Sequence, residues 1–215
     1  MSRRSGNSCG RAARIDGLGR SPTTVEVSHQ PPCPSVSVLL VIDPDTKDWT
    51  WVFARRCPEC GFDASSCAGG AVAALVRSSA SDWRTLFVEG SIAPGRTDPA
   101  KWSSLEYACH VRDVYRIYDQ RIALMLEHAD PLFPNWDQDA AAVAERYDEQ
   151  DPHTVVNDLV SNGATLADRL DGLSVDDWGR TGNRSDGASF TIDSISRYMI
   201  HDPIHHLRDV TVGRV

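Results

Sequence analysis

Residues 198–209 read Tyr-Met-Ile-His201-Asp-Pro-Ile-His205-His206-Leu-Arg-Asp209 and hold three of the seven histidines of the chain. His201 and His205 are four residues apart, so a helix would place both imidazoles on one face, one turn apart. His206 would point about 100° away from His205, and we expect it to pack beside the pair or to lie behind it. The stretch therefore predicts a helix that presents two metal-ligand candidates on one side.

A third candidate, His110, lies in residues 102–128, which also read as a helix with apolar residues recurring near one face. Three neutral imidazoles from two helices can hold one divalent metal ion and leave coordination positions open. That arrangement is typical of a catalytic site rather than a closed structural one. We therefore predict His110, His201 and His205 as the ligands of one ion, and zinc and nickel both suit three imidazoles.

Carboxylates flank these histidines in the sequence. Glu106 lies one turn before His110, and Asp202 directly follows His201. Metal-bound histidines usually give their second N–H to a carboxylate or a carbonyl, so these neighbours favour ligands over surface histidines. Asp202 and Glu106 are also the candidates for a catalytic base. Pro203 removes one backbone N–H inside the same helix and should kink it, which leaves the geometry of the histidine pair open.

Four long helices are predicted in all. Residues 152–172 begin with a proline that suits a first helical turn and end at a glycine. A short helix is expected near residues 140–147, and residues 179–187 predict a turn-rich loop or a small hairpin. The long helices span residues 63–87, 102–128, 152–172 and 191–212.

The histidines and the order of the helices resemble the DinB-like superfamily, also known as the YfiT-like or mycothiol-dependent S-transferase group. The resemblance covers roughly residues 48–212, and Leu173–Trp178 matches a Leu-Ser-x-x-x-Trp turn before the last helix. It implies an all-α four-helix bundle. It also implies one metal ligand on the second helix, matched by His110, and a His-x-x-x-His pair on the fourth, matched by His201 and His205.

The same resemblance implies a chemistry. In many members a low-molecular-weight thiol, such as mycothiol or bacillithiol, binds the metal as a thiolate and attacks a small electrophilic substrate. We therefore expect a metal-dependent thiol transferase. One alternative is a metal-dependent hydrolase that activates water, and another is a non-enzymatic metal- or ligand-binding stress protein. A pocket beside the histidines would favour an enzyme, whereas a filled bundle centre would favour the non-enzymatic alternative.

A second pattern, Cys57-Pro-Glu-Cys60-Gly61, has the form of a zinc knuckle. A four-sulfur zinc site usually needs two such knuckles, and the sequence contains one. Three interpretations stay open: a partial metal site completed by Cys67 or by another subunit, a redox dithiol, or a structural turn.

Composition sets the remaining expectations. Residues 1–42 are rich in Ser, Gly, Pro and Arg without periodicity, which predicts a disordered tail before a bundle domain at residues 43–215. The net charge of −8 argues against a nucleic-acid partner. No apolar run approaches the ~20 residues that span a membrane, and no disulfide framework is required, so a cytoplasmic location is expected. A homodimer is left open.

Overall fold

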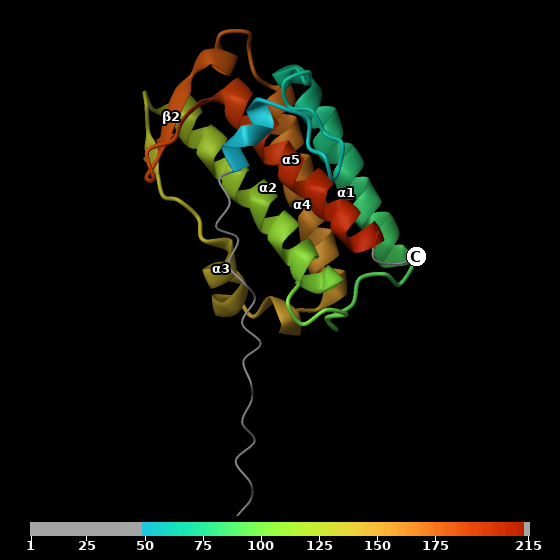
Figure 1. Ribbon diagram of the computed structural model, residues 1–215. Helices are drawn as coiled ribbons and strands as arrows, with labels where there is room; N and C mark the ends of the chain where they lie inside the picture. The colour runs from blue at the N-terminus through green and yellow to red at the C-terminus, as the bar shows by residue number, and fades with distance from the viewer. Residues whose placement is uncertain (1–48, 213–215) are drawn as a thin grey trace, which may run out of the picture. The chain divides into compact units, whose positions relative to one another are not determined.

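The computed structural model describes residues 49–212. The predicted tail, residues 1–42, lies outside the described residues. Four long helices form a bundle, which confirms the predicted all-α four-helix fold (Figure 1). They are α1 (Val72–Val88), α2 (Ser104–Glu127), α4 (Pro152–Asp171) and α5 (Ile192–Val212).

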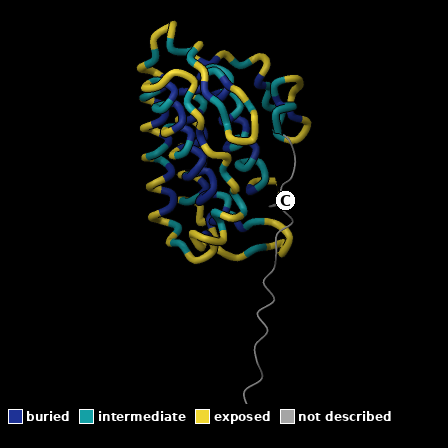
Figure 2. Tube along the Cα trace, turned by 90° about the vertical axis from the view of Figure 1, so that its left-hand side faces the viewer, coloured by how far each residue is buried: buried dark blue, intermediate teal, exposed yellow. Residues whose placement is uncertain are grey.

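The first two long helices, α1 and α2, are not packed against each other to any extent, and neither are the last two, α4 and α5. Helices α1 and α2 each pack mainly against α4 and α5, so α1 and α2 occupy opposite corners of the bundle. Figure 1 shows α5 in front between α2 and α1, with α4 behind. The buried residues lie on the inward faces of the helices and the exposed residues on the outward faces (Figure 2). One apolar core therefore runs the length of the bundle.

Helix ends follow local sequence signals. Ser103 and Glu106 form a capping box at the start of α2, and the Asp151 carboxylate accepts the Thr154 N–H at the start of α4. The predicted start of the first helix at residue 63 is wrong. Asp63 instead accepts the Ser65 N–H at 3.0 Å in a turn, and α1 begins only at Val72, after a 3₁₀ turn at Gly69–Ala71.

The late start of α1 has a physical cause. Two adjacent glycines disfavour a helix, and a Cβ at Gly69 would collide with the side chains of Trp178 and Asp193. These side chains come so close to the backbone that position 69 has room only for glycine, and the Gly69 N–H donates to the Asp193 carboxylate at 3.2 Å.

Smaller elements join the long helices. The predicted short helix is α3 (Gln138–Ala144), followed by a 3₁₀ turn at Tyr147–Glu149. Residues 179–187 contain part of a hairpin of β2 (Thr181–Arg184) and β3 (Ser189–Thr191), and β1 (Leu132–Phe133) pairs in parallel with β2. Two further 3₁₀ turns lie at Trp49–Phe53 and Asp177–Gly179.

Helix α5 continues from Ile192 to Val212 across the buried Pro203. The proline therefore does not end the helix at the histidine pair. Among residues 49–212, no helix is both long and apolar enough to cross a membrane.

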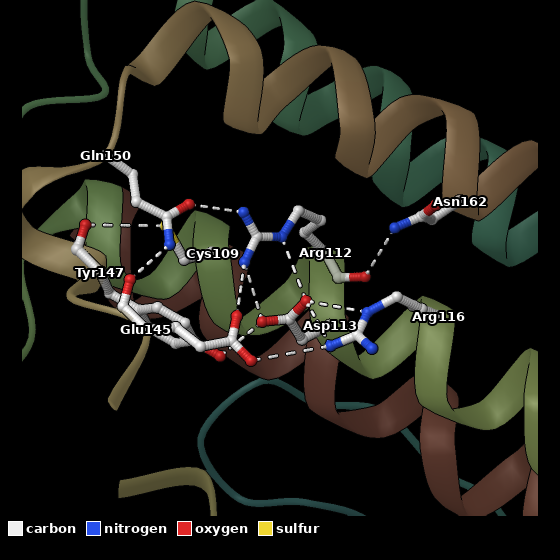
Figure 3. A network of polar contacts seen from close by, with 8 residues as sticks. All are labelled: Cys109, Arg112, Asp113, Arg116, Glu145, Tyr147, Gln150 and Asn162. Carbon is white, nitrogen blue, oxygen red and sulfur yellow. Dashed lines mark hydrogen bonds and ion pairs between the residues drawn. The ribbon is translucent and has the colours of Figure 1, made fainter. Parts of the chain in front are cut away.

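A polar network holds the connection after α3 against α2 (Figure 3). The buried Asp113 carboxylate accepts hydrogen bonds from Arg112 at 2.9 and 3.1 Å, from Arg116 at 3.1 Å and from the Tyr147 hydroxyl at 2.6 Å. Arg112 also donates to the Gln150 side chain at 2.6 Å. Burial alone would raise the pKa of Asp113, but the hydrogen bonds from Arg112 and Tyr147 outweigh it and lower that pKa. We call these five residues the Asp113 network.

Candidate metal centres

Helix α5 presents its donor side chains in two neighbouring rows, because residues four apart share a helix face. His201 and His205 form one row, and Asp202 and His206 form the next. The two rows meet different partners. Each row belongs to a separate group of side chains whose donor atoms converge.

The first group joins the His201–His205 row to the Cys57–Cys60 turn. One donor atom from each of the four residues lies within 4.8 Å of the others. The Cys57 Sγ is 3.6 Å from the His205 Nδ1. Cys57, His201 and His205 are buried, and Cys60 is partly buried. We call these four residues the cysteine group.

The second group joins the Asp202–His206 row to His110 on α2. The Asp202 Oδ1 lies 3.0 Å from the His110 Nε2 and 3.3 Å from the His206 Nε2. The His206 Nδ1 is 3.0 Å from Asp209. We call His110, Asp202 and His206 the aspartate group.

The structure therefore divides the three predicted histidine ligands between two groups. His201 and His205 do lie together, with ring centroids 5.2 Å apart. His110 instead faces Asp202 and His206. Within residues 49–212, the combination of His110, His201 and His205 is not among the groups of donors that converge.

Glu106, the other predicted catalytic carboxylate, has a different position. It is buried, pairs with Arg96 (Nε to Oε2 2.9 Å) and accepts the Ser103 N–H at 2.7 Å. Burial would raise the pKa of Glu106, but its hydrogen bonds, the one from Arg96 foremost, lower it. Glu106 therefore caps α2, whereas Asp202 sits between two histidines.

His110 is enclosed by aromatic rings. Trp136 stacks on it at 5.2 Å with an interplanar angle of 6°, and Trp102 lies 5.2 Å away on a tilted plane. The His110 ring is fully buried, and its Nδ1 has no hydrogen-bond partner among the described residues. Packing therefore fixes the ring with its Nε2 directed at Asp202.

A cavity of about 520 Å³ opens beside both rows of α5. Asp202, His206, His201 and His205 all contribute to its wall. Aromatic and basic side chains make up much of the remainder, namely Trp49, Tyr118, Trp136, Tyr198, Arg121 and Arg184. The bundle is thus not filled at this point, and a small molecule can reach the donor side chains.

The electrostatics keep His201, His205 and Asp202 in the forms that bind cations. Burial first, and then the neighbouring His205, lower the pKa of His201 to about 4, and burial also lowers the pKa of His205. Burial raises the pKa of Asp202, but His110 and His206 outweigh it and lower that pKa. At neutral pH His201 and His205 are neutral and Asp202 is ionised. Burial, aided by Cys57, raises the pKa of Cys60 to about 11, so this thiol is not a low-pKa redox nucleophile.

The sequence profile of the DinB superfamily matches residues 29–210. The chain belongs to the DinB superfamily. The match begins within the segment predicted as a tail. A solved structure of YfiT from Bacillus subtilis, described as "a probable metal-dependent hydrolase with an unusual four-helix bundle topology", shares the fold of this DinB-superfamily chain. The two are 16% identical with a TM-score of 0.59, over 67% of this chain and 86% of YfiT. No curated protein matches the chain.

Sequence reasoning missed two features of this DinB-superfamily chain. His206 was expected to pack beside the pair or to lie behind it, yet it belongs to the aspartate group. Its i, i+4 spacing from Asp202 was the available signal. Cys57 and Cys60 face His201 and His205. Cys57 and His205 are 148 positions apart in the sequence. The open interpretations had named Cys67 or another subunit, because no local spacing reveals so distant a partner.

Proposed function

We propose that this DinB-superfamily chain is a metal-dependent hydrolase of a small molecule, with His110, Asp202 and His206 as the ligands of its catalytic ion. The observation that carries the proposal is the convergence of these three donors, two of which, Asp202 and His206, line the 520 Å³ cavity. Two ligands of one tetrahedral ion with bonds of 2.0–2.1 Å lie ~3.4 Å apart. The separation of 3.3 Å from Asp202 to His206 agrees with that value, and the separation of 3.0 Å to His110 is shorter, at hydrogen-bond distance.

The donor set fits a catalytic centre. Two imidazoles and one carboxylate are the protein ligands of several catalytic zinc sites, which keep the fourth position open. A divalent metal held there would act as a Lewis acid and lower the pKa of a water nucleophile to about 7. Asp209 positions His206 by accepting from its Nδ1, so that the Nε2 stays directed at Asp202.

The cavity wall supplies the substrate site. Trp136 covers His110, and Tyr118 and Tyr198 add aromatic surface next to Arg184. Such rings exclude water and hold an apolar substrate body against the donors. The description of YfiT as a probable metal-dependent hydrolase supports the same chemistry by analogy of fold.

Thiol transfer is the second candidate for the same centre. The observation that favours it is the size of the cavity, since 520 Å³ lies within the range of small-molecule sites of roughly 300–1,000 Å³. Such a site has room for a thiol such as mycothiol or bacillithiol together with an electrophile. A filled bundle centre would have favoured the non-enzymatic stress-protein alternative, and the cavity gives that alternative no such support.

The test is a hydrolysis assay on a panel of small esters and amides without any thiol. We expect turnover by the wild type and at least a ~100-fold lower kcat/KM for Asp202→Asn, because even ligand-supporting groups contribute 10–100-fold. Asp168→Asn is the matched control, since Asp168 is an exposed carboxylate paired with Arg77 and lies outside both the donor groups and the cavity wall. Turnover that appears only with an added thiol would favour the transferase. Equal rates for wild type and Asp202→Asn would reject the aspartate group as the catalytic centre.

A further inference from the structure

The Cys57–Cys60 segment folds as a tight turn that points both sulfurs the same way. The Gly61 N–H donates to the Cys57 carbonyl at 3.0 Å, and the Cys57 N–H donates to the Phe62 carbonyl at 2.8 Å. Gly61 has φ +77°, a left-handed conformation that glycine adopts without strain. The turn thereby brings Cys57 and Cys60 into one group with His201 and His205.

The separations within the cysteine group match those of a metal centre. A tetrahedral ion with a sulfur at ~2.3 Å and a nitrogen at ~2.0–2.1 Å holds these two atoms ~3.6 Å apart. The Cys57 Sγ and the His205 Nδ1 are 3.6 Å apart. The four donor atoms all lie within 4.8 Å of one another, so one small cation can reach all four.

The surroundings of the two histidines agree with this arrangement. The His201 Nε2 is buried and has no hydrogen-bond partner within the described part of the chain. The His205 Nε2, on the side away from Cys57, lies 3.5 Å from Glu59 and 3.8 Å from Asp209. Metal-bound histidines commonly give their free N–H to a carboxylate in this way. Glu59 belongs to the cysteine turn itself.

We propose that Cys57, Cys60, His201 and His205 bind a zinc ion in a closed, structural site that is separate from the aspartate group. Two thiolates and two imidazoles in a tetrahedron are a donor set typical of zinc, and four protein ligands leave no open position. Each of the two thiols releases one proton to solvent when the ion binds. The site joins the segment before α1 to the last helix.

This ion has a consequence for the cavity. Trp49, at the start of the described residues, has its ring 5.5 Å from His201 and 5.4 Å from His205, and it lines the cavity. A zinc ion that fixes both histidines against Cys57 also fixes the surface on which Trp49 packs. The structural site therefore shapes one wall of the substrate pocket but takes no part in the reaction.

The first test is titration of the metal-free protein with cobalt(II). Wild type should give a near-ultraviolet sulfur-to-cobalt charge-transfer band, and the Cys57→Ser/Cys60→Ser double variant should lose it. Cys67→Ser is the matched control, since Cys67 is a free cysteine of the same segment outside the group, and it should keep the band. A band that survives in the double variant, or one that is absent from wild type, would overturn the proposal.

The second test needs no substitution and so does not depend on a variant that folds. Zinc-loaded and chelator-treated wild type are alkylated and the modified cysteines located by mass spectrometry. Zinc should protect Cys57 and Cys60, while Cys67 reacts in both samples. Equal modification of Cys57 and Cys60 with and without zinc would contradict the site.

The two proposals fail separately. Asp202→Asn should keep the cobalt–sulfur band while hydrolysis is lost. If wild type shows the band but no hydrolysis, the structural zinc site stands and the hydrolase proposal falls. If wild type hydrolyses a substrate but shows no sulfur-to-cobalt band, the hydrolase proposal stands and the structural zinc site falls.

Discussion

The Asp113 network at α2 and the two donor groups at α5 are both clusters of largely buried polar side chains. They differ in which atoms meet at their centres. In the Asp113 network, one carboxylate meets donors from Arg112, Arg116 and Tyr147. In the groups on α5, the atoms that converge are sulfurs, imidazole nitrogens and one carboxylate oxygen. The first cluster satisfies its carboxylate with hydrogen-bond donors of its own, whereas the second brings together atoms that can each bind a metal ion.

That difference separates a structural network from a binding site. A buried polar group that stays without a partner costs about 1–3 kcal/mol, so a fold keeps such groups where a ligand satisfies them. The His201 Nε2 is such a group, while both oxygens of the Asp113 carboxylate accept hydrogen bonds. The Asp113 network should therefore govern stability, and the α5 groups should govern metal binding.

The largest expected effect is a loss of folding stability when the Asp113 network is disrupted. Asp113→Ala removes the buried carboxylate that pairs with Arg112 and accepts from the Tyr147 hydroxyl, and removing one partner of a buried ion pair costs about 3–5 kcal/mol. Urea unfolding should show this loss, and the folded variant should bind as much metal as wild type. Asp168→Asn, which breaks an exposed pair with Arg77, is the control and should cost no more than ~1 kcal/mol. A similar small cost for Asp113→Ala would remove the distinction between the two regions.

Metal removal should have the next largest effect. An ion that binds only the folded chain stabilises it by about 2.7 kcal/mol at a hundred times its Kd. In a domain of this size that amounts to a fall in Tm of roughly 5–10 °C on chelation. Differential scanning calorimetry with and without chelator measures the fall. The Cys57→Ser/Cys60→Ser variant should show a smaller fall than wild type, and an identical fall in both would assign the stabilising ion elsewhere.

The pH dependence of the metal-free protein should report the Asp113 network. The pKa of Asp113 is lowered in the folded chain, so its contribution is complete above the unfolded value of about 3.9 and is lost as the pH falls through the lower folded value. Wild type should therefore lose stability below pH ~4 more steeply than Asp113→Ala. Urea midpoints at a series of acidic pH values measure the slopes. Parallel slopes would show that Asp113 titrates alike in both states.

The smallest effect is expected at the edge of the network. Arg116 is half exposed and shares Asp113 with the more buried Arg112. Arg116→Gln should therefore cost less than about 1 kcal/mol in urea unfolding. A loss as large as that of Asp113→Ala would mean that the outer arginine, and not the buried pair, holds the network together.

The sequence predicted the helices well where local signals were strong. Pro152 and Gly172 marked the ends of α4, and the apolar spacing marked α2 and α5. It failed at the start of α1, where the adjacent Gly69 and Gly70 were an available local signal against a helix, and where the packing of Trp178 and Asp193 against Gly69 is a tertiary contact.

The candidate site shows the same limit. The spacing of His201 and His205 correctly placed both on one face of a helix. Which of the two rows of α5 faces His110 depends on the rotation of α5 about its axis, which packing of the whole core determines. The partnership of Cys57 with His205 also required the fold, since 148 positions separate them.

The most direct test of two separate centres on α5 is the anomalous scattering of a metal-loaded crystal at the absorption edge of zinc. We predict two peaks per chain, one bound by Cys57, Cys60, His201 and His205 and the other by His110, Asp202 and His206. A single peak bound by His110, His201 and His205 together would contradict the division of α5 into two donor groups and restore the three-histidine site.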